Sequence, residues 1–66
     1  MNLDPKHLIS ILELNGFILK RSKGSHLLFY NNLTNRTVIV PFHGGKDMKK
    51  GTFLAILKQA GINKNT

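Results

Sequence analysis

The chain has 66 residues and no cysteine, which excludes disulfide crosslinks and thiolate metal sites and leaves room for one small hydrophobic core. Ten lysines and arginines face three acidic residues, giving a formal net charge of +7; this imbalance indicates an anionic partner, with nucleic acid as the first candidate. No segment has the apolar run of a signal peptide or the roughly 20 apolar residues of a membrane span, so we expect one cytoplasmic domain over residues 1–66.

The first predicted element is a helix over residues 5–14. Asp4 followed by Pro5 is typical of a helix start, because an aspartate caps the free amides of the first turn and a proline fits the first helical position. Apolar side chains then recur at helical spacing on one face: Leu8, Ile11 and Leu12. Asn15-Gly16 supplies the C-terminal stop.

Three strands are predicted next, over residues 17–22, 26–30 and 36–40. Lys23-Gly24 forms a short turn between the first two, and a polar loop precedes the third, which Pro41 closes. Short connections of this kind favour an antiparallel meander.

A second helix is predicted over residues 50–60, after a basic loop marked by Gly44-Gly45. Its apolar face consists of Phe53, Ile56, Leu57 and Ala60. Gly61 ends the helix, with Ile62 packing behind it. The predicted fold class is therefore α+β, in the order α-β-β-β-α, with both helices on one face of a three-stranded antiparallel sheet.

Strand alternation assigns the strand side chains to two faces. The side chains expected to point toward the helices are Phe17, Leu19, Leu27, Phe29, Val38 and Val40. Those expected on the open face are Ile18, Lys20, His26, Leu28, Tyr30, Thr37 and Ile39. The open face would then combine a histidine, a cation, an aromatic ring able to stack on a base, and an apolar patch typical of a protein-binding surface.

The Gly24-Ser25-His26 segment directly follows the densest positive charge of the chain, which comes from Lys20, Arg21 and Lys23. An imidazole takes or gives a proton near neutral pH, and RNA carries its own nucleophile in the ribose 2′-OH. One histidine with nearby cations therefore meets the minimum for RNA cleavage. The acidic residues are scattered along the chain, so we expect neither a metal ion nor another cofactor. His26 is the predicted catalytic residue.

Other side chains are candidates for holding phosphate or supporting the histidine. The predicted RNA-binding or phosphate-binding residues are Lys20, Arg21, Lys23, Ser25, Lys46, Lys49 and Lys50. The supporting residues are Gly24, Tyr30 and His43. His43 is either a second proton-transfer group or a residue that stabilises its own loop, and His7 is expected to be solvated.

Three function classes fit these features. The first is a ribonuclease that uses His26, the second is a non-catalytic RNA-binding module, and the third is a protein-interaction domain with an acidic partner. Loss of cleavage with retained RNA binding in a His26→Ala variant would separate the first class from the second. Binding that is indifferent to salt would favour the third.

Several motifs together resemble the family of HicA-type toxins. They are Gly16-Phe17, Gly24-Ser25-His26, Pro41-Phe42-His43, Gly51-Thr52 and the closing segment 56–62, in this order over nearly all of the chain. The resemblance implies a fold like that of double-stranded-RNA-binding domains and metal-independent mRNA interferase activity that arrests translation. It also implies inhibition by a HicB-type antitoxin, which we expect to cover the active face. The family's catalytic histidine corresponds to His26, and its Pro-x-His histidine to His43.

Overall fold

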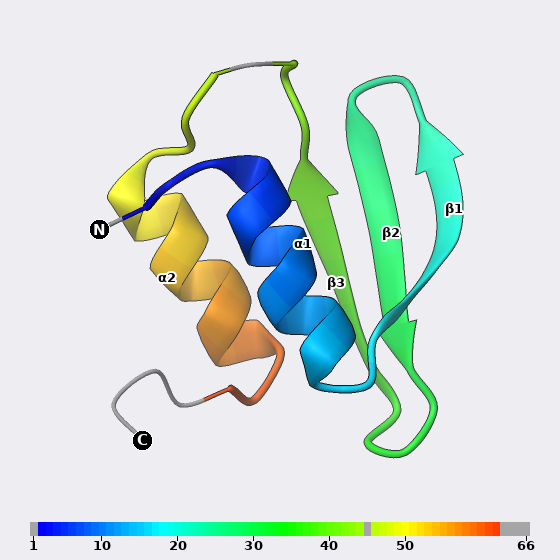
Figure 1. The fold of residues 1–66 in the computed structure, drawn as a ribbon. Coiled ribbons are helices and arrows are strands. Elements are labelled where there is room, and N and C mark those ends of the chain that lie inside the picture. Colours follow the sequence, from blue (N-terminus) through cyan, green and yellow to red (C-terminus); the bar gives the residue numbers. More distant parts are fainter. Residues whose placement is uncertain (1, 45, 63–66) are drawn as a thin grey trace.

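The computed structural model describes residues 2–44 and 46–62, so of the predicted Gly44-Gly45 turn it describes only Gly44. The elements are α1 (Pro5–Leu14), β1 (Ile18–Lys23), β2 (His26–Asn31), β3 (Arg36–Pro41) and α2 (Lys50–Gln59). The strands form an antiparallel sheet in the order β1-β2-β3, and both helices lie on one of its faces (Figure 1). This confirms the predicted α-β-β-β-α order and is consistent with the fold of double-stranded-RNA-binding domains. The strand bounds differ from the prediction by a residue.

Local capping signals explain why the helix bounds were predictable. The Asp4 side chain accepts a hydrogen bond from the Lys6 amide at 2.9 Å, as expected for a helix N-cap. Gly16 has a φ of 91°, and the amide of Phe17 donates back to the Leu12 carbonyl at 3.0 Å. This is a Schellman ending, and α2 ends in the same way at Gly61.

The hydrophobic core lies between the helices and the inner face of the sheet. Its buried members are Leu8, Leu12, Phe17, Phe29, Val38, Val40, Met48, Phe53, Ile56, Leu57 and Ala60. Both predicted helix faces contribute to it, and Ile62 packs against its margin as expected. Within the described residues, neither helix is long and apolar enough to cross a membrane.

Leu19 lies on the helix side of the sheet, as predicted, but it is not buried there. Leu19 pairs with the buried Phe29 and so shares its face of the sheet, yet 50% of the Leu19 side chain is exposed. The reason is that the helices pack over β3, at the opposite edge of the sheet, and leave β1 uncovered (Figure 1). Leu27, which was also predicted on the helix side, is half-buried and packs against the margin of the core.

Asn31 connects the end of α1 to the turn between β2 and β3. It is buried, with 4% of its surface exposed; its Nδ2 donates to the Asn15 carbonyl at 2.9 Å, and its Oδ1 accepts from the Leu33 amide at 2.9 Å. A Cβ at Gly16 would lie 3.2 Å from that Nδ2 atom, so the helix end and the asparagine fit closely.

Replacing Asn31 with alanine is expected to lower the free energy of unfolding by about 1–3 kcal/mol, because two backbone groups lose their partner. The loss is measured by urea denaturation. The neighbouring exposed Asn32→Ala is the control and is expected to change stability by no more than about 0.5 kcal/mol. Equal midpoints for the two variants would show that the asparagine contacts do not stabilise the fold.

Candidate active site

A two-residue turn places His26 at the start of the central strand. Lys23 and His26 are cross-strand partners, so Gly24 and Ser25 form the turn between them. Gly24 has a φ of 58° and Ser25 has a negative φ, the pattern of a type II′ hairpin turn, which requires glycine at its first central position. The Ser25 carbonyl accepts a hydrogen bond from the Phe42 amide at 2.6 Å, which ties the turn to the end of β3.

A β-bulge brings additional cations to the face of His26. The register shifts between Leu19 and Arg21, so that Lys20 has no partner in β2. Regular alternation from Ile18 would have turned Arg21 and Lys23 toward the helix side. The bulge instead sets Arg21 opposite Leu28 and Lys23 opposite His26, and paired residues share one face.

His26 lies in a shallow hollow on the open face. The hollow has a volume of about 210 Å³ and is lined by Arg21, Lys23, His26, Leu28 and Ile39. The histidine side chain is exposed, and the helices lie on the opposite face of the sheet (Figure 1). The hollow therefore combines an imidazole, which can transfer protons, with the two cations Arg21 and Lys23 and an apolar wall.

Tyr30 extends this face beyond the hollow. Its hydroxyl donates to Asn35 Oδ1 at 2.7 Å, which holds the ring in place, and Lys20 Nζ lies 5.9 Å from the ring centroid. Tyr30 pairs with Ile18 on one side and Thr37 on the other. The predicted members of the open face therefore do share it, and half of the Ile18 side chain is exposed there.

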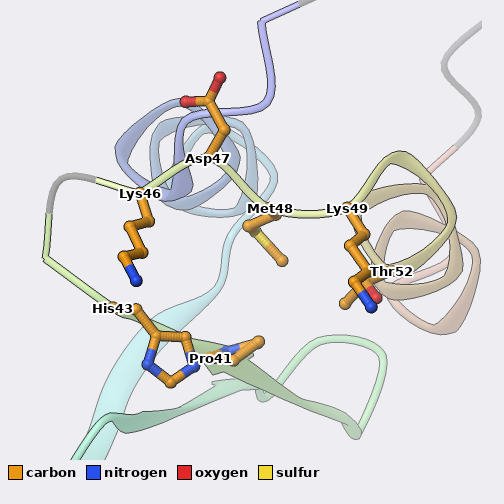
Figure 2. Close-up of a pocket in the computed structure, with 7 residues that line it drawn as sticks. All are labelled: Pro41, His43, Lys46, Asp47, Met48, Lys49 and Thr52. Atoms are coloured by element: carbon orange, nitrogen blue, oxygen red, sulfur yellow. The ribbon is translucent and has the colours of Figure 1, made fainter.

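Several of the other predicted residues lie around a second hollow, shown in Figure 2. Its volume is about 370 Å³, and its lining residues are Pro41, His43, Lys46, Asp47, Met48, Lys49 and Thr52. Lys46 extends toward the His43 ring, whereas the Asp47 carboxylate points away from it (Figure 2). The Lys46 amide also donates to the His43 carbonyl at 2.9 Å, which closes the loop. Lys50 does not line this hollow and is exposed at the first residue of α2.

The two predicted histidines occupy separate hollows. His26 lines the first and His43 the second, and the link between them is Pro41, which pairs with His26 and lines the second hollow. Leu28 and Ile39, the apolar wall of the first hollow, were predicted on the face of His26, but the sequence did not predict Pro41 or Met48 as lining groups. Only their tertiary placement identifies them, since an isolated proline or methionine carries no such signal.

The third histidine has a structural setting. The prediction that His7 is solvated is wrong: it is partly buried, and its ring stacks on Phe53 with 6.1 Å between centroids and 21° between planes.

Among residues 2–44 and 46–62, no three histidine, cysteine or acidic side chains come together as a metal site.

Comparison with known proteins identifies the family of the chain. No curated protein matches it, but a family model described as the HicA toxin of bacterial toxin-antitoxin matches residues 5–62. The match covers both helices, all three strands and both hollows. By this match the protein belongs to the HicA toxin family and is the toxin member of a pair with an antitoxin.

Proposed function

We propose that this toxin is a metal-independent endoribonuclease that cleaves mRNA and thereby arrests translation. The observation that carries the proposal is the hollow in which an exposed His26 lies beside Arg21 and Lys23. A side chain able to transfer a proton and two nearby cations, open to solvent on an uncovered sheet face, meet the minimum for RNA cleavage by the ribose 2′-OH.

In the proposed reaction the 2′-oxygen attacks the adjacent phosphorus, a new P–O2′ bond forms, and the P–O5′ bond breaks. The 2′-OH loses a proton and the leaving 5′-oxygen gains one. His26 accepts the first proton or supplies the second, while Arg21 and Lys23 bind the non-bridging oxygens as negative charge grows on the phosphorane. The products are a 2′,3′-cyclic phosphate and a 5′-hydroxyl.

The residues around the two hollows would bind the rest of the RNA. Gly24 has open space where a side chain would stand, so a phosphate can approach the turn closely, and Ser25 lies next to it. Flanking phosphates would bind the cations Lys20, Lys46, Lys49 and Lys50. We assign His43 a supporting place in the second hollow, away from the reacting phosphate.

We propose a HicB-type antitoxin as the inhibitor, covering His26 and the open face together. Ile18 and Ile39 are 51% and 52% exposed on that face, and such an apolar patch beside a charged site suits a protein interface. The pair would act in the cytoplasm, where mRNA is found.

The proposal is tested with purified toxin, RNA, and DNA of the same sequence, in the presence of EDTA. We expect the RNA to be cut and the DNA to remain whole, because DNA lacks the 2′-OH. Gel electrophoresis of the labelled strands measures both. Cleavage of DNA, or activity that EDTA abolishes, would contradict the mechanism. Salt-sensitive RNA binding without cleavage would support a non-catalytic RNA-binding module instead.

The cations of the first hollow are tested by the double variant Arg21→Gln/Lys23→Gln. For unpaired RNA, the slope of log affinity against log salt is expected to become shallower by about 0.7 for each phosphate that the protein no longer neutralises. Lys58→Gln, an exposed lysine in the last turn of α2, is the control and should keep the parent slope. An unchanged slope in the double variant would show that these two cations do not bind phosphate.

A further inference from the structure

We propose that the substrate is unpaired RNA that crosses the open face of the sheet, with a base stacked on Tyr30 and the scissile phosphate at His26. This inference rests on the proposed ribonuclease function and adds the structural class of the substrate and the path of its strand. The juxtaposition that carries it is an anchored aromatic ring, an apolar strip and a row of cations on the face that bears the histidine.

The open face has the chemistry of a base-binding platform. Tyr30 is held by its hydrogen bond to Asn35, so its ring is ordered before a base arrives. Leu28 and Ile39 lie between Tyr30 and the histidine hollow and line one side of that hollow. Aromatic and apolar side chains on an exposed sheet are the surfaces on which single-stranded nucleic acids stack their bases.

The cations lie where the backbone of such a strand would run. Lys20, Arg21 and Lys23 all come from β1, beside the central strand that carries Tyr30 and His26. Lys20 Nζ is 5.9 Å from the Tyr30 ring centroid, within reach of the phosphate of a nucleotide stacked there. Apolar platform and cationic margin thus run parallel, matching the bases and phosphates of one strand.

The length of the path fits a short single-stranded footprint. Tyr30 follows His26 by four residues on β2, which corresponds to about 13 Å at a rise of about 3.3 Å per residue. Up to about four nucleotides span this distance at the stacked repeat of about 3.4 Å. A base on Tyr30 would therefore fix which phosphate reaches the histidine.

A double helix does not fit this face. Paired RNA keeps its base faces inside the stack and offers phosphates and riboses, so an apolar strip gains little from it. Attack by the 2′-OH also needs the 2′-oxygen, phosphorus and 5′-oxygen close to a line, which an unpaired strand reaches by rotating its backbone. On the other face of the sheet, α1 adds no net positive charge for the phosphates of a duplex, because the charges of its exposed side chains cancel. These side chains are Lys6, Ser10, Glu13 and Leu14.

The test compares one short RNA, unpaired or annealed to its complement, for binding to a His26→Ala background and for cleavage by the parent toxin. We expect the unpaired form to bind more tightly and to be the form cleaved. In the binding background, Tyr30→Leu should weaken unpaired binding by about 5- to 150-fold, the worth of one stacked base, and leave duplex binding unchanged. Fluorescence anisotropy at fixed salt measures the affinity for the unpaired and for the duplex form, and gel electrophoresis measures cleavage.

Two further variants keep the result interpretable. Tyr30→Phe retains the ring but loses the hydrogen bond to Asn35, and it should keep most of the affinity that Tyr30→Leu loses, which separates stacking from that hydrogen bond. Leu33→Ala removes an exposed apolar side chain from the turn between β2 and β3 and is the control. Circular dichroism and urea midpoints confirm that each variant is folded.

Cleavage of the duplex at the rate of the unpaired strand would overturn the inference and leave the ribonuclease proposal intact. Unchanged RNA binding by Tyr30→Leu, together with a loss of antitoxin binding, would also overturn it, because the face would then serve a protein alone. Absence of any cleavage with binding that still depends on Tyr30 would refute the ribonuclease proposal and support the platform.

Discussion

A His26→Ala toxin is expected to cleave RNA about 10²- to 10⁴-fold more slowly than the parent, the usual contribution of one general acid or base. His26 is exposed in its hollow, so its removal leaves the core and the neighbouring cations in place. RNA affinity and the urea midpoint should therefore stay close to those of the parent. Growth of a host that expresses the variant without antitoxin should continue, whereas the parent stops it.

The matched control for this experiment is Leu33→Ala, which also removes an exposed side chain, here from the turn between β2 and β3. It should cleave RNA at the parent rate. Parent-level cleavage by a folded His26→Ala toxin would contradict the assignment of the catalytic residue. Loss of both binding and cleavage would indicate that the histidine acts by holding RNA.

The largest effect on stability is expected from Phe53→Ala. Phe53 has no exposed surface, lies on the inner face of α2, and stacks with His7 of α1. Truncating a buried phenylalanine costs about 3–5 kcal/mol. A domain of this length has a total stability of roughly 3–10 kcal/mol at the usual value per residue, so a large part of it would be lost.

Urea denaturation of Phe53→Ala and of Leu54→Ala compares two neighbouring residues of one helix. Leu54 is exposed, and its truncation should cost no more than about 1 kcal/mol. We also expect the Phe53 variant to lose toxicity through unfolding, although none of the residues that line the His26 hollow is changed. A Phe53 variant as stable as the Leu54 variant would show that the packing of α2 does not limit stability.

The helices were predictable because their signals are local. Asp4 and Gly16 mark the ends of α1 within a few residues, and the capping bonds confirm both. The burial of Phe29 and Val38 followed from strand alternation. The exposure of Leu19 did not follow from it, because that exposure depends on where the helices lie over the sheet, and alternation carries no information on that.

The candidate site was only partly predictable for a similar reason. The run from Lys20 to Lys23 is polar throughout, so no alternation of apolar residues marks the bulge within it. The bulge nevertheless decides that Arg21 and Lys23 share the face of His26. The second hollow arises where the end of β3 meets the loop before α2, a tertiary contact that spacing along the chain does not encode.

The central claim is that this open sheet face cleaves RNA by means of the 2′-OH of the RNA itself. The most direct measurement is mass spectrometry of the ends formed by the purified toxin in EDTA. The account predicts a 5′-hydroxyl on one fragment and a 2′,3′-cyclic phosphate, or the 3′-phosphate formed from it, on the other. Fragments that end in a 5′-phosphate and a 3′-hydroxyl would contradict it, because they require water as the nucleophile.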